Sequence, residues 1–173
     1  TAGTVVNGGT LTLSNINLAS SESISLTGTG GGSGALQGSG VSSVAASNVI
    51  TLAGNATIAS VGALTINGAI GESGGARSLT KSGFGVLTLA GNNSYSGATI
   101  VSDGTLAAGA ADVLDNSSGV NLSVSGATLN LAGFNQSLSK LDGVNGAIVT
   151  NNAGNTNDTA TLTISAGGGS YVG

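Results

Sequence analysis

The sequence of 173 residues contains no cysteine, histidine, proline, methionine or tryptophan, and only 6% of its residues are charged. Without cysteine and histidine, disulfide bonds, the usual zinc sites and catalytic centres built on these side chains are excluded. The only cations are Arg77, Lys81 and Lys140, and the formal net charge is −4, so we expect no nucleic-acid partner. No apolar run approaches the ~18 residues of a membrane span, and we expect a chain that does not itself cross a membrane.

The apolar residues, 39% of the chain, alternate with polar ones, and this pattern predicts short strands with one buried face. Turns rich in glycine, asparagine and serine separate these strands. No segment has helical spacing over three turns, and Ala107–Leu114 has room for at most one short helical turn. The alternating segments are Leu11–Leu13, Ile24–Leu26, Ile50–Leu52, Leu64–Ile66, Leu87–Leu89, Leu122–Val124, Leu129–Leu131 and Leu162–Ile164.

Internal repetition favours a solenoid over a sandwich or a barrel. The tripeptide Leu-Ala-Gly recurs at Leu52–Gly54, Leu89–Gly91 and Leu131–Gly133. Each step between these copies fits two coils of about 20 residues, within the range of solenoid repeats. In addition, Thr4–Leu11 aligns without gaps on Thr99–Leu106, with five of eight positions identical. We predict an all-β parallel β-helix of about 8–9 turns, with essentially no helix and a right-handed coil.

The stretch Ser78–Leu106 carries a leucine and a lysine before a glycine pair, then Leu-Thr-Leu, Asn-x-Tyr-x-Gly and Gly-Thr-Leu. Over its whole length this stretch closely resembles the passenger-associated repeat of bacterial autotransporters. The segment Thr4–Leu11 resembles half of a second copy. Phe84 departs from the pattern, because a small residue is usual there, and this departure is expected to mark a local contact.

The resemblance implies a right-handed parallel β-helix in a secreted or surface-displayed passenger. We expect residues 1–173 to form one β-helix segment of a longer, repetitive extracellular protein, whose carboxy-terminal translocator is absent from this chain. The first residues, Thr1–Gly9, show neither the charged nor the apolar region of a signal peptide.

Several polar residues are candidates for chemistry. Asp112 and Asp115 are two carboxylates three residues apart, and paired carboxylates can perform acid–base catalysis, but a solvated loop is favoured. Arg77, with Glu72 and Lys81 nearby, raises the alternative of a polysaccharide lyase, because lyases share the β-helix. The resemblance assigns Lys81 to the structural pattern of the repeat. We predict no catalytic, cofactor-binding or metal-binding residues and no cofactor, and hence no enzyme.

Two further features suggest binding. Tyr95 and Tyr171 could stack on sugar rings, although packing over the adjacent turn is favoured for Tyr95. An outward row of uncharged, hydroxyl-rich positions raises a second alternative, binding to ice or to a crystalline polymer. That row comprises Thr12, Ser25, Thr51, Thr65, Thr88, Ser123, Asn130 and Thr163.

We therefore predict a non-enzymatic stalk, spacer or adhesin segment that is extracellular or displayed on a bacterial surface. Its expected partners are neighbouring β-helix turns of the same or identical chains, and host or matrix glycans or proteins. Because open strand edges invite pairing, we expect flanking turns to cover the ends of the coil, or copies to stack head to tail. Such self-association through the ends would make the isolated fragment multimeric.

Overall fold

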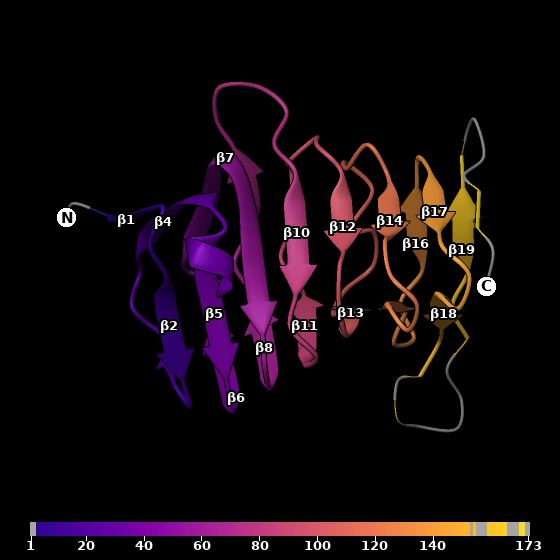
Figure 1. Cartoon of the computed structure of the whole chain (residues 1–173), viewed down its shortest axis with the longest axis horizontal. Helices are drawn as coiled ribbons and strands as arrows, with labels where there is room; N and C mark the ends of the chain where they lie inside the picture. Colours follow the sequence, from indigo (N-terminus) through magenta and orange to yellow (C-terminus); the bar gives the residue numbers. More distant parts are fainter. Residues whose placement is uncertain (1–2, 153, 155–158, 166–169, 172–173) are drawn as a thin grey trace.

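The computed structural model describes residues 3–152, 154, 159–165 and 170–171. The chain forms an all-β parallel solenoid of about seven turns, which follow one another along the long axis from the indigo amino-terminal end to the yellow carboxy-terminal end (Figure 1). The predicted fold class is therefore confirmed. Among the described residues the one helical element is a three-residue 3-10 turn, η1 (Gly30–Gly32), and no helix is long and apolar enough to cross a membrane.

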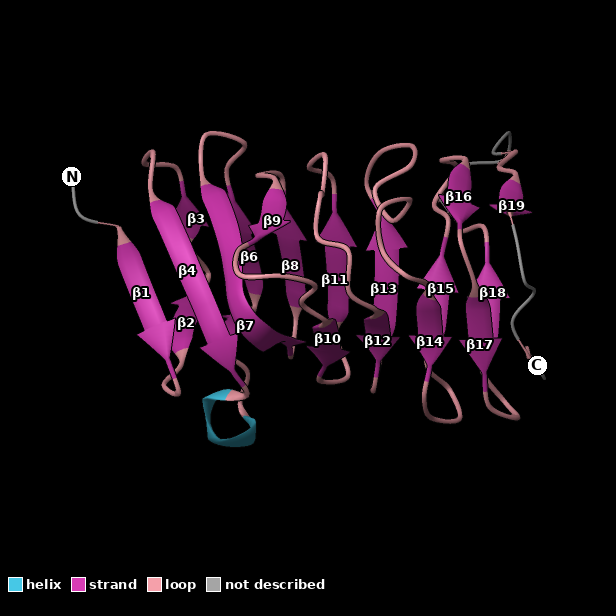
Figure 2. Cartoon of the chain, turned by 90° about the horizontal axis from the view of Figure 1, so that it is seen from above, coloured by secondary structure: helices cyan, strands magenta, loops and turns pink. Residues whose placement is uncertain are grey.

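The strands are arranged on three faces of the coil (Figure 2). Face one contains β1 (Thr4–Asn7), β4 (Ser23–Gly28), the first part of β7 (Val49–Ser60) and β9 (Ile70–Glu72). Face two contains β2 (Leu11–Ser14), β5 (Leu36–Ser39), the last part of β7, β10 (Leu79–Ser82), β12 (Thr99–Val101), β14 (Val120–Leu122) and β17 (Leu141–Gly143). Face three contains β3 (Asn17–Leu18), β6 (Val41–Val44), β8 (Ala63–Ile66), β11 (Val86–Leu89), β13 (Thr105–Ala108), β15 (Thr128–Asn130) and β18 (Ile148–Thr150). Near the carboxy-terminal end, β16 (Gln136–Leu138) pairs with β19 (Leu162–Ile164).

The strand pairs of the described residues are parallel and join successive turns, but the length of a turn varies. The turn that leads from Val86 to its partner Thr105 is clearly shorter than the turn that leads from Ile24 to its partner Ile50. The prediction of eight or nine turns was too high, because it assumed that every turn is about as short as the turn from Val86 to Thr105. The extra residues are accommodated in connections such as 109–119, between β13 and β14.

The core is a set of aliphatic columns inside the coil. On face three, Leu64, Leu87, Leu106 and Leu129 are Cα partners in successive turns, and each is at most 1% exposed. Burying a leucine stabilises a fold by about 1.5–3 kcal/mol, so each turn adds a similar increment. The column requires strict alternation, because a shift of one residue would turn every leucine outward.

Glycines form the corner between faces two and three. A Cβ atom at Gly62 would meet the carbonyl oxygen of Gly40, and one at Gly85 would meet the carbonyl oxygen of Gly62. Gly83 and Gly104, at the same corner, have φ values of +76° and +63°. Glycine is therefore required here both for close backbone approach and for the left-handed conformation.

One local prediction was wrong, and one possibility that the sequence left open is not realised. The segment Leu122–Val124 is not a strand, because β14 begins at Val120 and ends at Leu122. The short helical turn allowed at Ala107–Leu114 does not form. Instead, Ala107 and Ala108 complete strand β13, where they pair in register with Thr88 and Leu89. Pairing with the preceding turn thus overrides the weak helical preference of this alanine-rich segment.

We predict that one whole turn can be removed. Leu79 pairs with both Ala56 and Thr99, so deleting residues 79–98 brings Thr99 onto Ala56 with buried and outward positions kept in phase. Circular dichroism should show an unchanged β spectrum, and small-angle X-ray scattering should show a rod shorter by about 4.8 Å. Deleting only 79–88 is the matched control, since it joins one face to another, and this variant should lose cooperative unfolding. Equal behaviour of the two deletions would contradict the stacking.

Candidate functional site

Lys81 is the most unusual polar residue of the fold, because its side chain is buried at the glycine corner. It lies on β10 and faces inward, between the half-buried Thr80 and Ser82. Its Nζ donates hydrogen bonds to three backbone carbonyls, those of Ser82 (3.0 Å), Gly83 and Asp103 (3.0 Å). Asp103 belongs to the next turn, so one ammonium group ties two successive corners together.

Burial lowers the pKa of Lys81 to about 8, and the nearby charge of Asp103 opposes that shift. A lowered lysine pKa in a cleft is a feature of some catalytic bases. Here the ammonium protons point at carbonyl oxygens of the corner, so the arrangement is that of a structural cross-link.

Tyr95 is also buried, and its hydroxyl lies 2.7 Å from the hydroxyl of Thr99. Burial raises the pKa of this phenol to about 12. The packing of Tyr95 within the coil, favoured from the sequence, is confirmed, and its ring is not available to stack on a sugar. Tyr171 is 39% exposed and donates a hydrogen bond to the carbonyl of Ala147, so part of its ring still faces solvent.

Buried amides replace missing strand hydrogen bonds along face one, a feature that the sequence analysis did not identify. Asn93 accepts from the backbone N–H of Ile70 and donates to the carbonyl of Val113. The Gln136 side chain likewise accepts a hydrogen bond from the backbone N–H of Val113. Near the amino-terminal end, the Asn48 side chain accepts from the backbone N–H of Glu22 and donates to the carbonyl of Leu18. Each amide bridges two turns where the backbone is irregular. Only Asn93 had a signal in the sequence, as the asparagine of Asn-x-Tyr-x-Gly.

Arg77 and Glu72 close the loop 73–78 onto itself. The Glu72 carboxylate accepts from the Arg77 backbone N–H (2.7 Å) and from the Ser96 hydroxyl (2.6 Å), and the Ser96 hydrogen bond lowers its pKa. The Arg77 guanidinium donates to the carbonyls of Ser73 and Gly74 in its own loop. The structure thus brings together the pair considered for a lyase, but both groups are engaged in shaping the loop.

Asp112 and Asp115 are both exposed and have separate partners. Asp112 accepts from the backbone N–H of Ser137, and Asp115 accepts from the side chain of Asn116. No group of three or more histidine, cysteine, aspartate or glutamate side chains that could hold a metal occurs among the described residues. The two carboxylates therefore show no joint geometry that would suit acid–base catalysis.

The residues of the hydroxyl-rich row do not form one flat array. Ser25 and Thr51 lie on face one, Thr12 on face two, and Thr65, Thr88 and Asn130 on face three. Thr163 lies on β19, and Ser123 lies at the corner after β14. An ice or crystalline-polymer lattice needs a single plane, and the structure distributes these residues around the coil.

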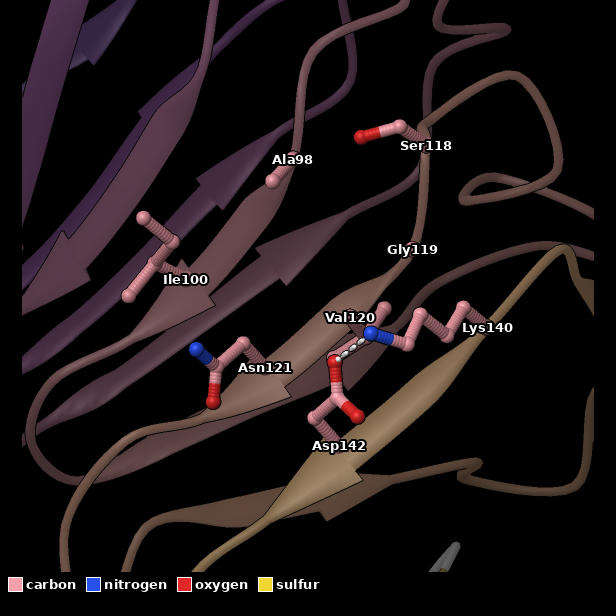
Figure 3. Close-up of a pocket in the computed structure, with 8 residues that line it drawn as sticks. All are labelled: Ala98, Ile100, Ser118, Gly119, Val120, Asn121, Lys140 and Asp142. Atoms are coloured by element: carbon pink, nitrogen blue, oxygen red, sulfur yellow. Dashed lines mark ion pairs between the residues drawn. The ribbon is translucent and has the colours of Figure 1, made fainter. Parts of the chain in front are cut away.

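A shallow depression of about 220 Å³ lies on face two, across β12, β14 and β17 (Figure 3). Lys140 and Asp142 form an ion pair of 2.8 Å beside it, and the hydrogen bond from Lys140 lowers the pKa of Asp142. Asn121 pairs with Asp142 on the neighbouring strand, and Ile100 pairs with Asn121 one strand further along. Charged, amide and aliphatic groups thus meet at the surface, which suits contact with a polar partner.

The comparisons with known proteins agree with this geometry. Residues 79–108 match the family profile of the passenger-associated-transport-repeat. The chain contains an autotransporter passenger repeat. We refer to residues 79–108 as the transport repeat. It begins on β10, ends with β13, and includes Lys81, the glycine corner, Asn93 and Tyr95.

Over an alignment of 111 residues, which covers 59% of this chain, the sequence is 35% identical to the adhesin BmaC autotransporter of Brucella suis biovar 1 (strain 1330). Part of the chain is thus similar to an autotransporter that is named as an adhesin. It spans 3% of the length of that curated relative. The comparison with solved structures found no significant match.

We predict that replacing Lys81 destabilises the fold. In Lys81→Met the three partly buried corner carbonyls lose a charged donor, and the free energy of unfolding should fall by about 1–3 kcal/mol. Lys140→Met is the matched control, because Lys140 is half exposed and its ion pair lies at the surface. Urea unfolding should leave the control close to wild type. A loss confined to Lys140→Met would contradict the cross-link.

Burial of Lys81 also predicts a pH dependence. Between pH 8 and 10 the folded chain releases this proton, whereas the unfolded chain, with the ordinary lysine pKa of 10.5, retains it. Since the unfolded state then binds more protons, the free energy of unfolding of wild type should rise with pH relative to Lys81→Met. Tyr95, whose pKa is raised, acts in the opposite direction only above pH 10. A constant difference from pH 8 to 10 in urea titrations would refute the assignment.

Proposed function

We propose that this chain is a non-enzymatic rod segment of a secreted or surface-displayed passenger, which separates flanking parts of the protein and presents an adhesive surface. The observation that carries the proposal is the continuous column of Leu64, Leu87, Leu106 and Leu129. In such a solenoid, length grows with the number of turns and each turn contacts only its neighbours. A rod of this kind can hold the flanking parts of the protein apart.

The engagement of the candidate catalytic groups supports the non-enzymatic part of the proposal. A lyase base must be free to remove a proton from its substrate. The Arg77 guanidinium donates to two carbonyls of its own loop, and the Lys81 ammonium is enclosed by three carbonyls. Using either group as a base would first require breaking the local fold.

The adhesive part of the proposal rests on the relative named as an adhesin and on the depression of face two. The ion pair of Lys140 and Asp142 beside Asn121 offers donors and acceptors to hydroxyl and amide groups of a matrix glycan or protein. Ile100 adds an aliphatic contact on the neighbouring strand. Extracellular or surface location follows from the same relationship and is part of this proposal.

Two assays on the purified chain test the proposal. Incubation with acidic polysaccharides should release no unsaturated product detectable by ultraviolet absorbance, and wild type and Arg77→Ala should behave alike. Beads coated with the chain should be retained on cell monolayers or matrix proteins above albumin-coated beads, and retention should fall when Lys140 and Asp142 are both replaced by alanine. Product formation that Arg77→Ala abolishes would replace the proposal with the lyase alternative. Absence of retention would leave the spacer role alone.

A further inference from the structure

Face three of the solenoid is a seven-stranded parallel surface without any charged side chain at its outward positions. In Figure 2 its strands β6, β8, β11, β13, β15 and β18 lie side by side along the rod. Two outward columns run across these strands, and their members are Cα partners in successive turns. One column comprises Val41, Ala63, Val86, Thr105, Thr128 and Ile148, and the other comprises Ser43, Thr65, Thr88, Ala107, Asn130 and Thr150.

The first column exposes large apolar side chains that the core does not use. Val41 is 77% exposed, Ile148 is 47% exposed and Val86 is 39% exposed. Phe84, which is 73% exposed, lies at the corner that leads into β11. This strand is the middle one of the seven, so the most exposed aromatic residue borders the centre of the face. Val41, Ala63 and Val86 follow one another in this column, whereas Thr105 and Thr128 separate them from Ile148. Neighbouring exposed apolar groups of this kind mark interaction surfaces.

The distribution of charge points to a second copy of this chain. The formal net charge is −4, so two copies repel each other over most of their surface. Face three is where they can meet without juxtaposing like charges at the centre. No described charged residue lies on a strand of face three, although Asp103 lies at the corner that leads into β13. The other described charged residues lie on other strands or connections: Glu22, Glu72, Arg77, Lys81, Asp112, Asp115, Lys140 and Asp142.

We propose that two copies of the chain associate laterally, face three against face three. The inference goes beyond the rod function proposed above and does not involve the ends of the coil. Sheets that pack face to face lie about 10 Å apart, and both faces here have the same strand spacing of about 4.8 Å. The contact is isologous, with a two-fold axis close to the middle strand, so Val86 and Thr88 of each copy lie near their counterparts.

The size of the face determines how strong this association is. Seven strands of about four residues cover about 13 Å by 34 Å, so the complex buries about 900 Å² in total. A stable interface of standard size buries about 1,600 Å². One segment alone therefore forms a weak, concentration-dependent dimer, and the strength of the contact increases with the number of turns that carry such a face.

Sedimentation equilibrium of the purified chain tests the proposal. The weight-average mass of wild type should rise from the monomer value of 16.1 kDa toward twice that value as concentration increases. Val86→Lys places a charge at the centre of face three and should remain monomeric over the same range. Thr80→Lys, on the outward side of β10 on face two, is the matched control with the same net charge, and it should associate like wild type.

A second measurement locates the contact without relying on a destabilising change. Since the chain has no cysteine, Thr88→Cys and Thr80→Cys each provide a single thiol. A short bis-maleimide should cross-link Thr88→Cys into dimers and leave Thr80→Cys monomeric.

Three outcomes would overturn the proposal. The first is wild-type protein that stays monomeric at millimolar concentration. The second is equal loss of association in both lysine variants, or a dimer cross-linked only through Thr80→Cys, because the contact would then lie outside face three. The third is monomeric wild-type protein that binds a neutral glycan array and loses this binding in Val86→Lys, because the occupant of the face would then be a glycan. Circular dichroism confirms that each variant is folded.

Discussion

The backbone hydrogen bonds between residues about one turn apart are the constraint on which the rest of this structure depends. They fix each strand above its equivalent, as Leu79 lies between Ala56 and Thr99, and so place identical side-chain positions on top of one another. The narrow interior then has to be filled by Leu, Ile, Val and Ala. This explains why a chain with so few aromatic residues can still be well packed.

Stacking alone does not close the corners, and the polar residues of the transport repeat complete them. Where the coil bends most sharply, glycine permits close approach of backbones and Lys81 supplies three donors to the carbonyls that face inward. Where face one becomes irregular, the side-chain amides of Asn93 and Gln136 accept the backbone hydrogen bonds that a strand would otherwise accept. In this chain the residues whose types suit chemistry mostly satisfy backbone groups, and the function proposed follows from the shape and surface of the rod.

Much of the fold could be predicted from the sequence, because period-two alternation identifies strands whose inner positions are constrained. Leu87–Leu89 is an example, with strand β11 extending only one residue further. The number of turns could not be predicted, since the connections vary and leave no periodic signal. Alternation also cannot tell which face a strand joins, so threonines and serines predicted to form one row lie on different faces. Thr4–Val6 lies on face one, whereas its sequence counterpart Thr99–Val101 lies on face two.

The candidate site was harder to predict because residue types that usually lie on the surface are buried in it. A lysine in a strand is ordinarily an outward residue, and only the repeat pattern indicated that Lys81 is structural. The buried roles of Asn48 and Gln136 depend on contacts across turns, which no local pattern encodes.

The distance between Ser43 and Thr150 tests the stacked arrangement most directly. These residues lie in one outward column of face three, five turns apart. Spin labels on cysteines placed at both positions can be measured by double electron–electron resonance. Stacked turns predict a narrow distribution centred near about 24 Å between the backbones, from five spacings of about 4.8 Å. A broad distribution, or a distance far from this value, would contradict the solenoid.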